Sequence, residues 1–487
     1  MMPFEPVVLP TDALVYALIV LTALFAWYVR RHEHLAAPWR RVVRSRAGMV
    51  ALTILLCYVV IGFLDTLHFR TLLPEQNGKR VYAVEVLSVF DVIASPLRDH
   101  KEKTYSAPFA TRLYMEETIE RPGGGKWRGY PRLEYGGAQL KDPATQRLPD
   151  IARRGLAGAG GGLVLWLLCA VALCAIRARR SGESLPAAWR TVWRGDTVVP
   201  WNAVLITLGV IFCLSGAAVA LCSHYHIFGT DKVGQDVFYL ALKSIRTGLI
   251  IGTLTTMAML PFALLLGIAA GYFGGWVDDV IQYVYTTLSS IPSVLLIAAA
   301  VLMTQVYISN HPELFSTIAA RADLRLLSLC LILGITSWTS LCRLLRGEAL
   351  KLRDADYIQA ARAMGVSSWQ IIMRHILPNV MHIVLITTVM DFSGLVLAEA
   401  VLSYIGVGVD PSTISFGNMI NAARLELARD PPVWWSLVAA FFFMLLLVLS
   451  ANLFADAVRD AFDPRLKPAG ARKPARQPAA RRNEEAA

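Results

Sequence analysis

The chain contains long runs of apolar residues, and these constrain its fold more than any other feature. A helix that crosses the hydrocarbon core of a membrane needs roughly 20 mostly apolar residues. About nine segments approach or exceed this length, and hydrophobic residues make up 55% of the 487 positions. The segments are residues 13–29, 47–63, 156–176, 203–222, 249–273, 280–303, 324–345, 383–406 and 433–454. We therefore predict an all-α integral membrane protein with about nine transmembrane helices.

The distribution of Lys and Arg predicts how these helices are oriented, because short cytoplasmic loops are enriched in both residues. The basic segments are residues 30–46, 177–199, 343–380 and the tail after residue 454. With nine spans, all four fall on one side, which predicts an external N-terminus and a cytoplasmic C-terminus. The net charge of +11 reflects this bias, so nucleic acid is not expected as a partner.

The first apolar run is predicted to be an anchor rather than a cleaved signal peptide. No Lys or Arg precedes it, whereas Arg30 and Arg31 follow it directly. A signal peptide has the opposite order. All seven Cys lie in or beside apolar segments, where we expect them to act as small buried side chains.

Residues 64–155 form the one long polar segment, which the topology places outside the membrane. Within it, residues 81–92 alternate apolar and polar side chains over short stretches, and this pattern favours strands. Glycines at 158–162 open the next apolar run and predict close helix packing. The sequence identifies neither the fold nor the role of this insert.

A polar loop at residues 354–379 separates two of the predicted spans. Asp356 is predicted to cap a short helix, with Gln359 completing the cap. Ala360 and Ala361 favour that helix and give it a smooth face. Gly365 offers a left-handed helix end at little cost.

A second short helix is predicted to follow, because Ser367 and Gln370 repeat the capping pattern. Pro378, after Leu377, is predicted to end this helix or to begin the next one. Two short helices at a sharp turn form a rigid knob that can transmit force to a docked partner. The alternative is a pair of helices that only cover the membrane surface.

An outer loop at residues 226–237 is predicted to lead into an interfacial helix capped by Thr230 or Asp231. Its ligand spacing does not fit a calcium-binding loop. His224 and His226 lack further His or Cys neighbours in the loop, so no metal site is expected. The motif residues are Gly229, Thr230, Asp231, Gly234 and Asp236.

These two loops resemble signatures of ABC importer permeases of the dipeptide/oligopeptide/nickel branch. The inner loop is similar to the EAA loop of that family at Gln359, Ala360, Ala361, Gly365, Leu377 and Pro378. It departs from the pattern at Gln359, where Glu is usual, and at His375, where Ile is usual. The outer loop resembles the family's GTDxxGRDV element, with Gln235 in place of Arg. Further resemblances occur at residues 271–278, 397–406, 415–417 and 456–465.

The resemblance covers roughly residues 223–467 and implies a type I ABC importer permease core with extra N-terminal helices and an extracytoplasmic insert. The predicted division is 1–63 for N-terminal transmembrane helices, 64–155 for the insert, 156–222 for additional transmembrane helices, 223–467 for the permease core and 468–487 for a disordered basic tail. The core would contain the coupling loop at 354–379.

The resemblance also implies the partners and the location. A permease of this kind works in the bacterial inner membrane, among membrane lipid, with a second permease subunit, two ABC ATPase subunits and an extracytoplasmic solute-binding protein. The chain has no phosphate-binding GxxxxGK[ST] loop and no catalytic or metal-binding motif. We therefore expect no enzymatic activity and no bound cofactor, with ATP hydrolysis in the separate ATPase subunits. Peptides or a related small solute, such as a nickel chelate, are the expected substrates.

Two acidic residues, Asp391 and Glu399, fall within a predicted span, where a charge is costly and often functional. Both are candidates for the translocation path, although Glu399 could instead pair with a neighbouring helix or backbone. Two other function classes stay open at this stage. A secondary transporter would work without an ATPase but needs inverted repeats, which the sequence lacks. A membrane-anchored sensor would place its function in residues 64–155.

Overall fold

The computed structural model describes residues 4–73, 82–120, 126–195, 197–311 and 317–462. The predicted disordered tail at 468–487 lies outside these residues. Within them, eight helical segments are long and apolar enough to cross a membrane. They are α1 (Pro10–Arg31), α3 (Arg46–Thr66), α6 (Pro143–Ser181), α8 (Trp201–Cys222), α9 (Val237–Phe273), α11 (Ser293–Asn310), the continuous helix Ser368–Ile405, and α17 (Trp435–Phe462). The prediction of an all-α membrane protein is confirmed.

Two predicted spans differ in detail from the structure. The span at 324–345 lies within α12 (Ile318–Arg353), a long helix that is not one of those eight. The span at 280–303 is wrong as a single helix, because α10 (Gly275–Ser290) ends before α11 begins. Ile291 between them is extended, with φ −87° and ψ 131°. Pro292 causes the break, since a proline disfavours helical geometry in the residue before it.

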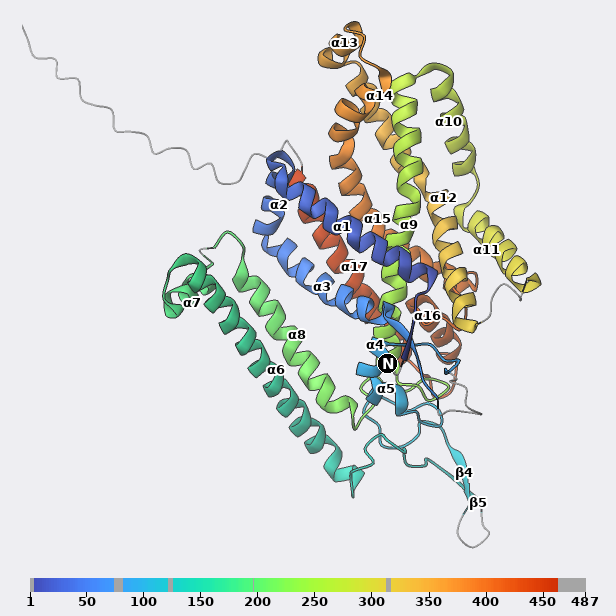
Figure 1. Ribbon diagram of the computed structural model, residues 1–487. Coiled ribbons are helices and arrows are strands. Elements are labelled where there is room, and N and C mark those ends of the chain that lie inside the picture. Colours follow the sequence, from blue (N-terminus) through green and yellow to red (C-terminus); the bar gives the residue numbers. More distant parts are fainter. Residues whose placement is uncertain (1–3, 74–81, 121–125, 196, 312–316, 463–487) are drawn as a thin grey trace, which may run out of the picture.

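The shorter elements lie at the two ends of the bundle (Figure 1). The upper end carries α13 and α2, and the opposite end carries the hairpin β4–β5 with α4 and α5. Their bounds are α2 Glu33–Arg44, α4 Val89–Ile93, α5 Ser95–Asp99, α7 Leu185–Arg194, α13 Asp356–Ala363, α16 Phe416–Glu426, β1 Phe4–Val7, β2 His68–Thr71, β3 Leu87–Ser88, β4 Glu117–Glu120 and β5 Lys126–Gly129.

The insert contains little regular structure in its described part. Its strands β2 and β3 form an antiparallel sheet with β1 from the N-terminal segment, in which Val7 pairs with His68 and Phe69 pairs with Leu87. Within the described residues, the strand prediction for residues 81–92 holds in β3 and in an isolated bridge between Tyr82 and Leu72, and α4 begins at Val89. Ser88 stops the strand there, since its hydroxyl oxygen accepts a hydrogen bond from the Asp91 N–H in a reciprocal cap.

The centre of the bundle is the pair α9 and α12, which run parallel and in close contact. Gly267 and Gly271 on α9 leave space for the backbone of α12 near Cys342 and Arg346. Gly334 on α12 does the same for Ala258 of α9. Small residues let helix backbones approach closely in a membrane, where van der Waals packing drives helix association.

The glycines at 158–162 place α6 against α8, as the sequence predicts. A Cβ on Gly158 would overlap the Gly216 carbonyl oxygen, and one on Gly162 would overlap the Phe212 carbonyl oxygen. Gly160 and Gly161 have no neighbour within 4 Å of an added Cβ. Only the glycines of one helix face are therefore required for this contact.

We expect Gly162→Ala to destabilise the α6–α8 pair by about 1–3 kcal/mol, because the methyl group forces the two backbones apart. Gly161→Ala is the matched control, and it should be neutral or slightly stabilising, since Ala favours helices over Gly. Thermal unfolding of the purified variants measures both. Equal effects from the two substitutions would contradict the proposed contact.

Candidate functional site

The inner loop forms the predicted knob, but its first helix has no side-chain cap. Ala355 is the N-cap of α13, and Asp356 occupies the first turn. The predicted capping role of Asp356 is therefore wrong. Its carboxylate still lies near the positive end of the helix dipole, which favours a negative charge there.

Helix α13 has one buried face and one exposed face. Ile358 is fully buried and Ala361 is 6% exposed, and both belong to the hydrophobic cluster that includes Tyr272 of α9. Gln359 and Ala360 are exposed on the opposite face. The knob is thus seated on the transmembrane helices by one side, while the other side is free in this chain.

Gly365 ends this helix as predicted, with φ +77°. Its N–H donates to the Arg362 carbonyl at 3.0 Å, and the Val366 N–H donates to the Ala361 carbonyl at 3.1 Å. A residue with a side chain would be strained in this left-handed conformation. Gly365 therefore fixes the sharp turn between the two helices of the knob.

The second helix of the knob continues into the membrane without a break. Ser367 caps α14 (Ser368–Ile371), accepting a hydrogen bond from the Gln370 N–H at 3.4 Å, as predicted. A π-helical segment, η2 (Ile372–Ile376), joins α14 to α15 (Leu377–Ile405). The prediction that Pro378 begins the next helix is confirmed, because it lies in the first turn of α15, although the helical path is continuous from Ser368 to Ile405. The wider π turn accommodates the proline ring, which would clash with a carbonyl one turn earlier in a regular helix.

An ion pair fixes the turn beside the knob. Arg346 of α12 binds Asp278 of α10 through two hydrogen bonds, Nε to Oδ1 at 2.5 Å and Nη2 to Oδ2 at 2.7 Å. The Arg362 guanidinium of α13 lies 5.5 Å from the centre of the Tyr272 ring. A bidentate ion pair restricts geometry and also adds stabilisation. Helices α9, α10 and α12 therefore form one rigid support for α13, which we call the seat of the knob.

The outer motif caps α9, but through a different residue from those predicted. Asp236 accepts hydrogen bonds from the N–H groups of Phe238 at 2.8 Å and Tyr239 at 3.3 Å. The predicted capping by Thr230 or Asp231 is wrong. Asp231 instead closes a turn within the loop, accepting from the Gln235 N–H at 2.8 Å.

Gly229, Thr230 and Gly234 of the outer motif contact the insert. The Thr230 N–H donates to the Ser106 carbonyl at 3.1 Å, and the Glu102 N–H donates to the Gly234 carbonyl at 2.9 Å. A Cβ on Gly229 or Gly234 would overlap these backbone segments of the insert. Both glycines also have positive φ, +68° and +75°. The insert is therefore packed directly onto the permease core.

A buried histidine links the two parts. His226 is 4% exposed, with Nδ1 at 2.7 Å from Asp236 Oδ2 and Nε2 at 3.4 Å from Glu102 Oε1. Burial would lower the pKa of His226, but the two carboxylates raise it to about 9. Burial would raise the pKa of Glu102, but the bond to His226 and three backbone N–H donors lower it to about 2. The network is a charged clamp between the insert and α9.

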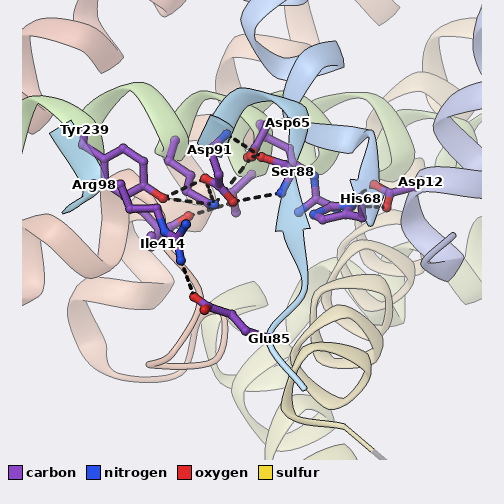
Figure 2. Close-up of polar contacts among 12 residues, drawn as sticks. Asp12, Asp65, His68, Glu85, Ser88, Asp91, Arg98, Tyr239 and Ile414 are labelled. Atoms are coloured by element: carbon purple, nitrogen blue, oxygen red, sulfur yellow. Dashed lines mark hydrogen bonds and ion pairs between the residues drawn. The ribbon is translucent and has the colours of Figure 1, made fainter. Parts of the chain in front are cut away.

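Figure 2 shows a second polar network, which joins the insert to α9 near its outer end. Lys243 Nζ lies 2.5 Å from Asp91 Oδ1 and 3.7 Å from Asp65 Oδ1. The Tyr239 hydroxyl donates to Asp91 at 2.7 Å, and the Ser88 hydroxyl donates to Asp65 at 2.6 Å. Burial would raise the pKa of Asp91, but the Lys243 ammonium and the hydrogen bonds hold it below its usual value.

The same network extends to the first helix. Arg246 of α9 binds Asp12 of α1 at 2.7 Å, and His68 Nδ1 lies 2.8 Å from the other Asp12 oxygen. Asp323 of α12 accepts from the Thr11 N–H at 3.0 Å. Sequence analysis missed these contacts, because the partners come from distant segments and no motif marks them.

The two intramembrane acids have different surroundings. Glu399 is 2% exposed and accepts hydrogen bonds from the hydroxyls of Ser403 at 2.7 Å and Ser415 at 3.0 Å. These bonds tie α15 to the start of α16, which favours the alternative of a structural pairing for Glu399. Asp391 is half-buried, and no hydrogen bond or ion pair to it is found among the described residues.

The clamp predicts how stability depends on pH. The pKa of His226 is about 9 in the folded protein, above its ordinary value of 6.5. Protonated His226 therefore contributes fully to the free energy of unfolding below pH 6.5, and this contribution is lost as the pH rises towards 9. We expect the unfolding temperature to fall across this range, and His226→Gln to remove that fall. His224→Gln should retain it, because the pKa of His224 is lowered. Identical pH profiles for the wild-type protein and His226→Gln would refute the clamp.

Comparison with known proteins identifies the core. Residues 263–468 match the family described as "Binding-protein-dependent transport system inner membrane component". An oligopeptide transport system permease protein, OppC, of Mycobacterium bovis is 33% identical over 239 residues, which are 49% of this chain and 76% of the relative. A dipeptide permease, DppC, of Lactococcus lactis is 30% identical over 49% of this chain and 64% of the relative. A glutathione permease, GsiD, of Pectobacterium atrosepticum is 31% identical over 50% of this chain and 74% of the relative.

These matches agree with the positions of the two loops. The knob lies within the matched residues, at one end of the bundle, and the outer motif lies at the other end. The helices between them are long and apolar enough to cross a membrane. The chain thus belongs to the family of inner-membrane permease subunits of ATP-driven, binding-protein-dependent ABC importers.

Proposed function

We propose that this permease carries peptides, or related small solutes, into the cell. Relatives named as oligopeptide, dipeptide and glutathione permeases support this substrate class. Its partners would be a second permease subunit, two ABC ATPase subunits and an extracytoplasmic solute-binding protein. The N-terminus would lie outside and the C-terminus in the cytoplasm. The chain itself would bind no cofactor and catalyse no reaction, since ATP hydrolysis takes place in the ATPase subunits.

The observation that carries the proposal is the exposed face of α13. Gln359 and Ala360 face away from the seat formed by Ile358 and Ala361, and Gly365 lies at the exposed end of the same helix. This surface would enter a groove of the ATPase. Leu377 and Pro378 would act differently, by joining the knob to the continuous helix that runs through the membrane.

The mechanism follows from the rigid seat. Closure of the ATPase pair on ATP would displace the knob. Because the knob is packed on α9 and is covalently continuous with α15, both helices would move with it. The path between the two permeases would then open alternately to the outside and to the inside.

The two alternative function classes receive less support. No ATPase-independent transporter is among the relatives named above. An independent sensor domain is disfavoured by the contacts of the insert, because Glu102 and Ser106 are bonded to the outer motif of the core. Deleting residues 64–155 would therefore disturb the permease itself as well as any sensing role.

We expect Ala360→Arg to reduce ATPase recovery by about ten-fold or more, because a buried, unpaired charge disrupts an interface. The substitution keeps the fold, since Ala360 is exposed and Arg favours helices. The measurement is co-purification of the ATPase in mild detergent, together with substrate uptake. Gly365→Arg and Ala361→Arg should also reduce ATPase recovery, but each would in addition disturb the knob, because Gly365 has φ +77° and Ala361 is packed against the transmembrane helices.

Ala187→Arg in α7 is the matched control, because Ala187 is also exposed on a short helix next to a basic segment. It should leave both the ATPase complex and uptake unchanged. Normal ATPase binding by both Ala360→Arg and Gly365→Arg would contradict the proposal that the knob contacts the ATPase.

Asp391 is the remaining candidate for the translocation path. It lies on α15 beside a stripe of exposed residues that includes Met390, Leu397 and Val401. These three side chains are 42–50% exposed in the described structure, so we propose that their exposed surface faces the second permease. An acidic side chain at that interface would attract a cationic group of the substrate.

We expect Asp391→Asn to lower the uptake of lysine-containing peptides by about ten-fold, since it removes the charge partner and preserves the shape. Uptake of glutamate-containing peptides should change much less. The measurement compares the two peptides in the same cells. An unchanged uptake ratio would exclude Asp391 from substrate selection.

A further inference from the structure

The helix pair α6 and α8, together with α7, stands at one side of the bundle (Figure 1). Within the described residues, α6 packs on α8 and α7, and α8 packs on α3. One face of α6 is therefore directed away from the rest of the chain. A groove of about 680 Å³ lies along this face, near the end that carries α7.

The lining of the groove changes from apolar to basic along the helix. Cys169, Leu173 and Ile176 form the apolar part, and Arg177 and Arg180 form the basic part. These positions recur at helical spacing, so they lie along one side of α6. Trp201, at the start of α8, also lines the groove. Trp is typical of the membrane–water interface, which places this end at headgroup depth.

The two arginines are not paired with an acidic side chain of the described residues. Neither forms an ion pair with a carboxylate of the described residues, and the Arg177 Nε is shielded from solvent without a hydrogen-bond partner. A buried, unpaired N–H is costly, so such a group favours a ligand that accepts a hydrogen bond. A phosphodiester oxygen supplies both the negative charge and the acceptor.

We infer that this groove binds an anionic phospholipid, with its phosphate between Arg177 and Arg180 and one acyl chain along the apolar side of α6. The distance from Ile176 to Cys169 along the helix is roughly 10 Å, which accommodates part of an acyl chain. Basic pockets at the cytoplasmic ends of transmembrane helices are known to hold such headgroups.

The alternatives fit less well. A soluble phosphate would gain nothing from the apolar part of the groove, and a neutral lipid would bring no net negative charge to the two guanidinium groups. The inference rests on the location of the chain in a membrane, and it does not depend on the proposed substrate or on the ATPase contacts. The lipid would fill the outer face of the added helix pair and fix it in the membrane.

The test is native mass spectrometry of the purified full-length protein, titrated with phosphatidylglycerol and, separately, with phosphatidylcholine. The wild-type protein should bind phosphatidylglycerol more tightly. Replacing both arginines, Arg177→Gln with Arg180→Gln, should weaken this binding by about 25-fold, at about five-fold for each basic side chain. Phosphatidylcholine binding should change little.

The matched control is Arg179→Gln with Arg190→Gln, which removes the same charge from exposed positions outside the groove. It should keep the preference for phosphatidylglycerol. Equal weakening by both double variants would overturn the inference, because it would indicate diffuse attraction to the basic surface. Equal binding of the two lipids by the wild-type protein would also overturn it.

A third variant tests the groove without changing an arginine, and it can be used if the arginine double variant fails to fold. Ala172 is exposed and lines the groove, so Ala172→Trp fills the apolar part without altering charge. It should abolish tight binding of phosphatidylglycerol while the unfolding temperature and elution volume stay unchanged. Full binding by this variant would exclude the groove as the site.

Discussion

The parallel contact of α9 with α12 supports most of the structure. Helix α9 has 37 residues and therefore spans roughly 55 Å, from the outer motif to the knob. Its outer end is capped by Asp236, and its inner end packs beneath α13 through Tyr272. Glycines 267 and 271 set its distance from α12. One helix thus connects the surface that would meet a binding protein with the surface that would meet an ATPase.

The residues added before the core are attached to this same helix by buried charges. Lys243 and Arg246 of α9 each bind an aspartate from the N-terminal segments, and Asp236 shares His226 with Glu102. Burying a single charge is costly, but paired and hydrogen-bonded charges recover much of that cost. Loss of one partner would leave the other uncompensated. The insert and the first helix are therefore integral parts of this permease, held where α9 leaves the membrane.

Two kinds of feature could be predicted from the sequence. One depends on the average hydrophobicity of a segment, and the other depends on the backbone conformation of a single residue. The apolar runs located the spans because transfer into lipid depends mainly on composition. Gly365 was predictable because a left-handed turn strongly favours glycine. Asp356 and Thr230 were assigned caps wrongly, since several neighbouring side chains could cap each helix and tertiary contacts select among them. Glu102 could not be found at all, because its partner His226 is 124 residues away.

If the knob receives a displacement from the ATPase, as proposed above, two helices that meet at the knob would transmit it across the membrane. Ile358 and Ala361 pack the knob against α9, and the π segment lets the chain continue from α14 into α15 despite Pro378. A break at Pro378 would have acted as a hinge and dissipated a displacement of the knob. A continuous helix of 38 residues would instead carry that displacement to Glu399, which accepts a hydrogen bond from Ser415 at the start of α16. The geometry therefore favours rocking of α9, α15 and α16 as one body over bending of separate segments.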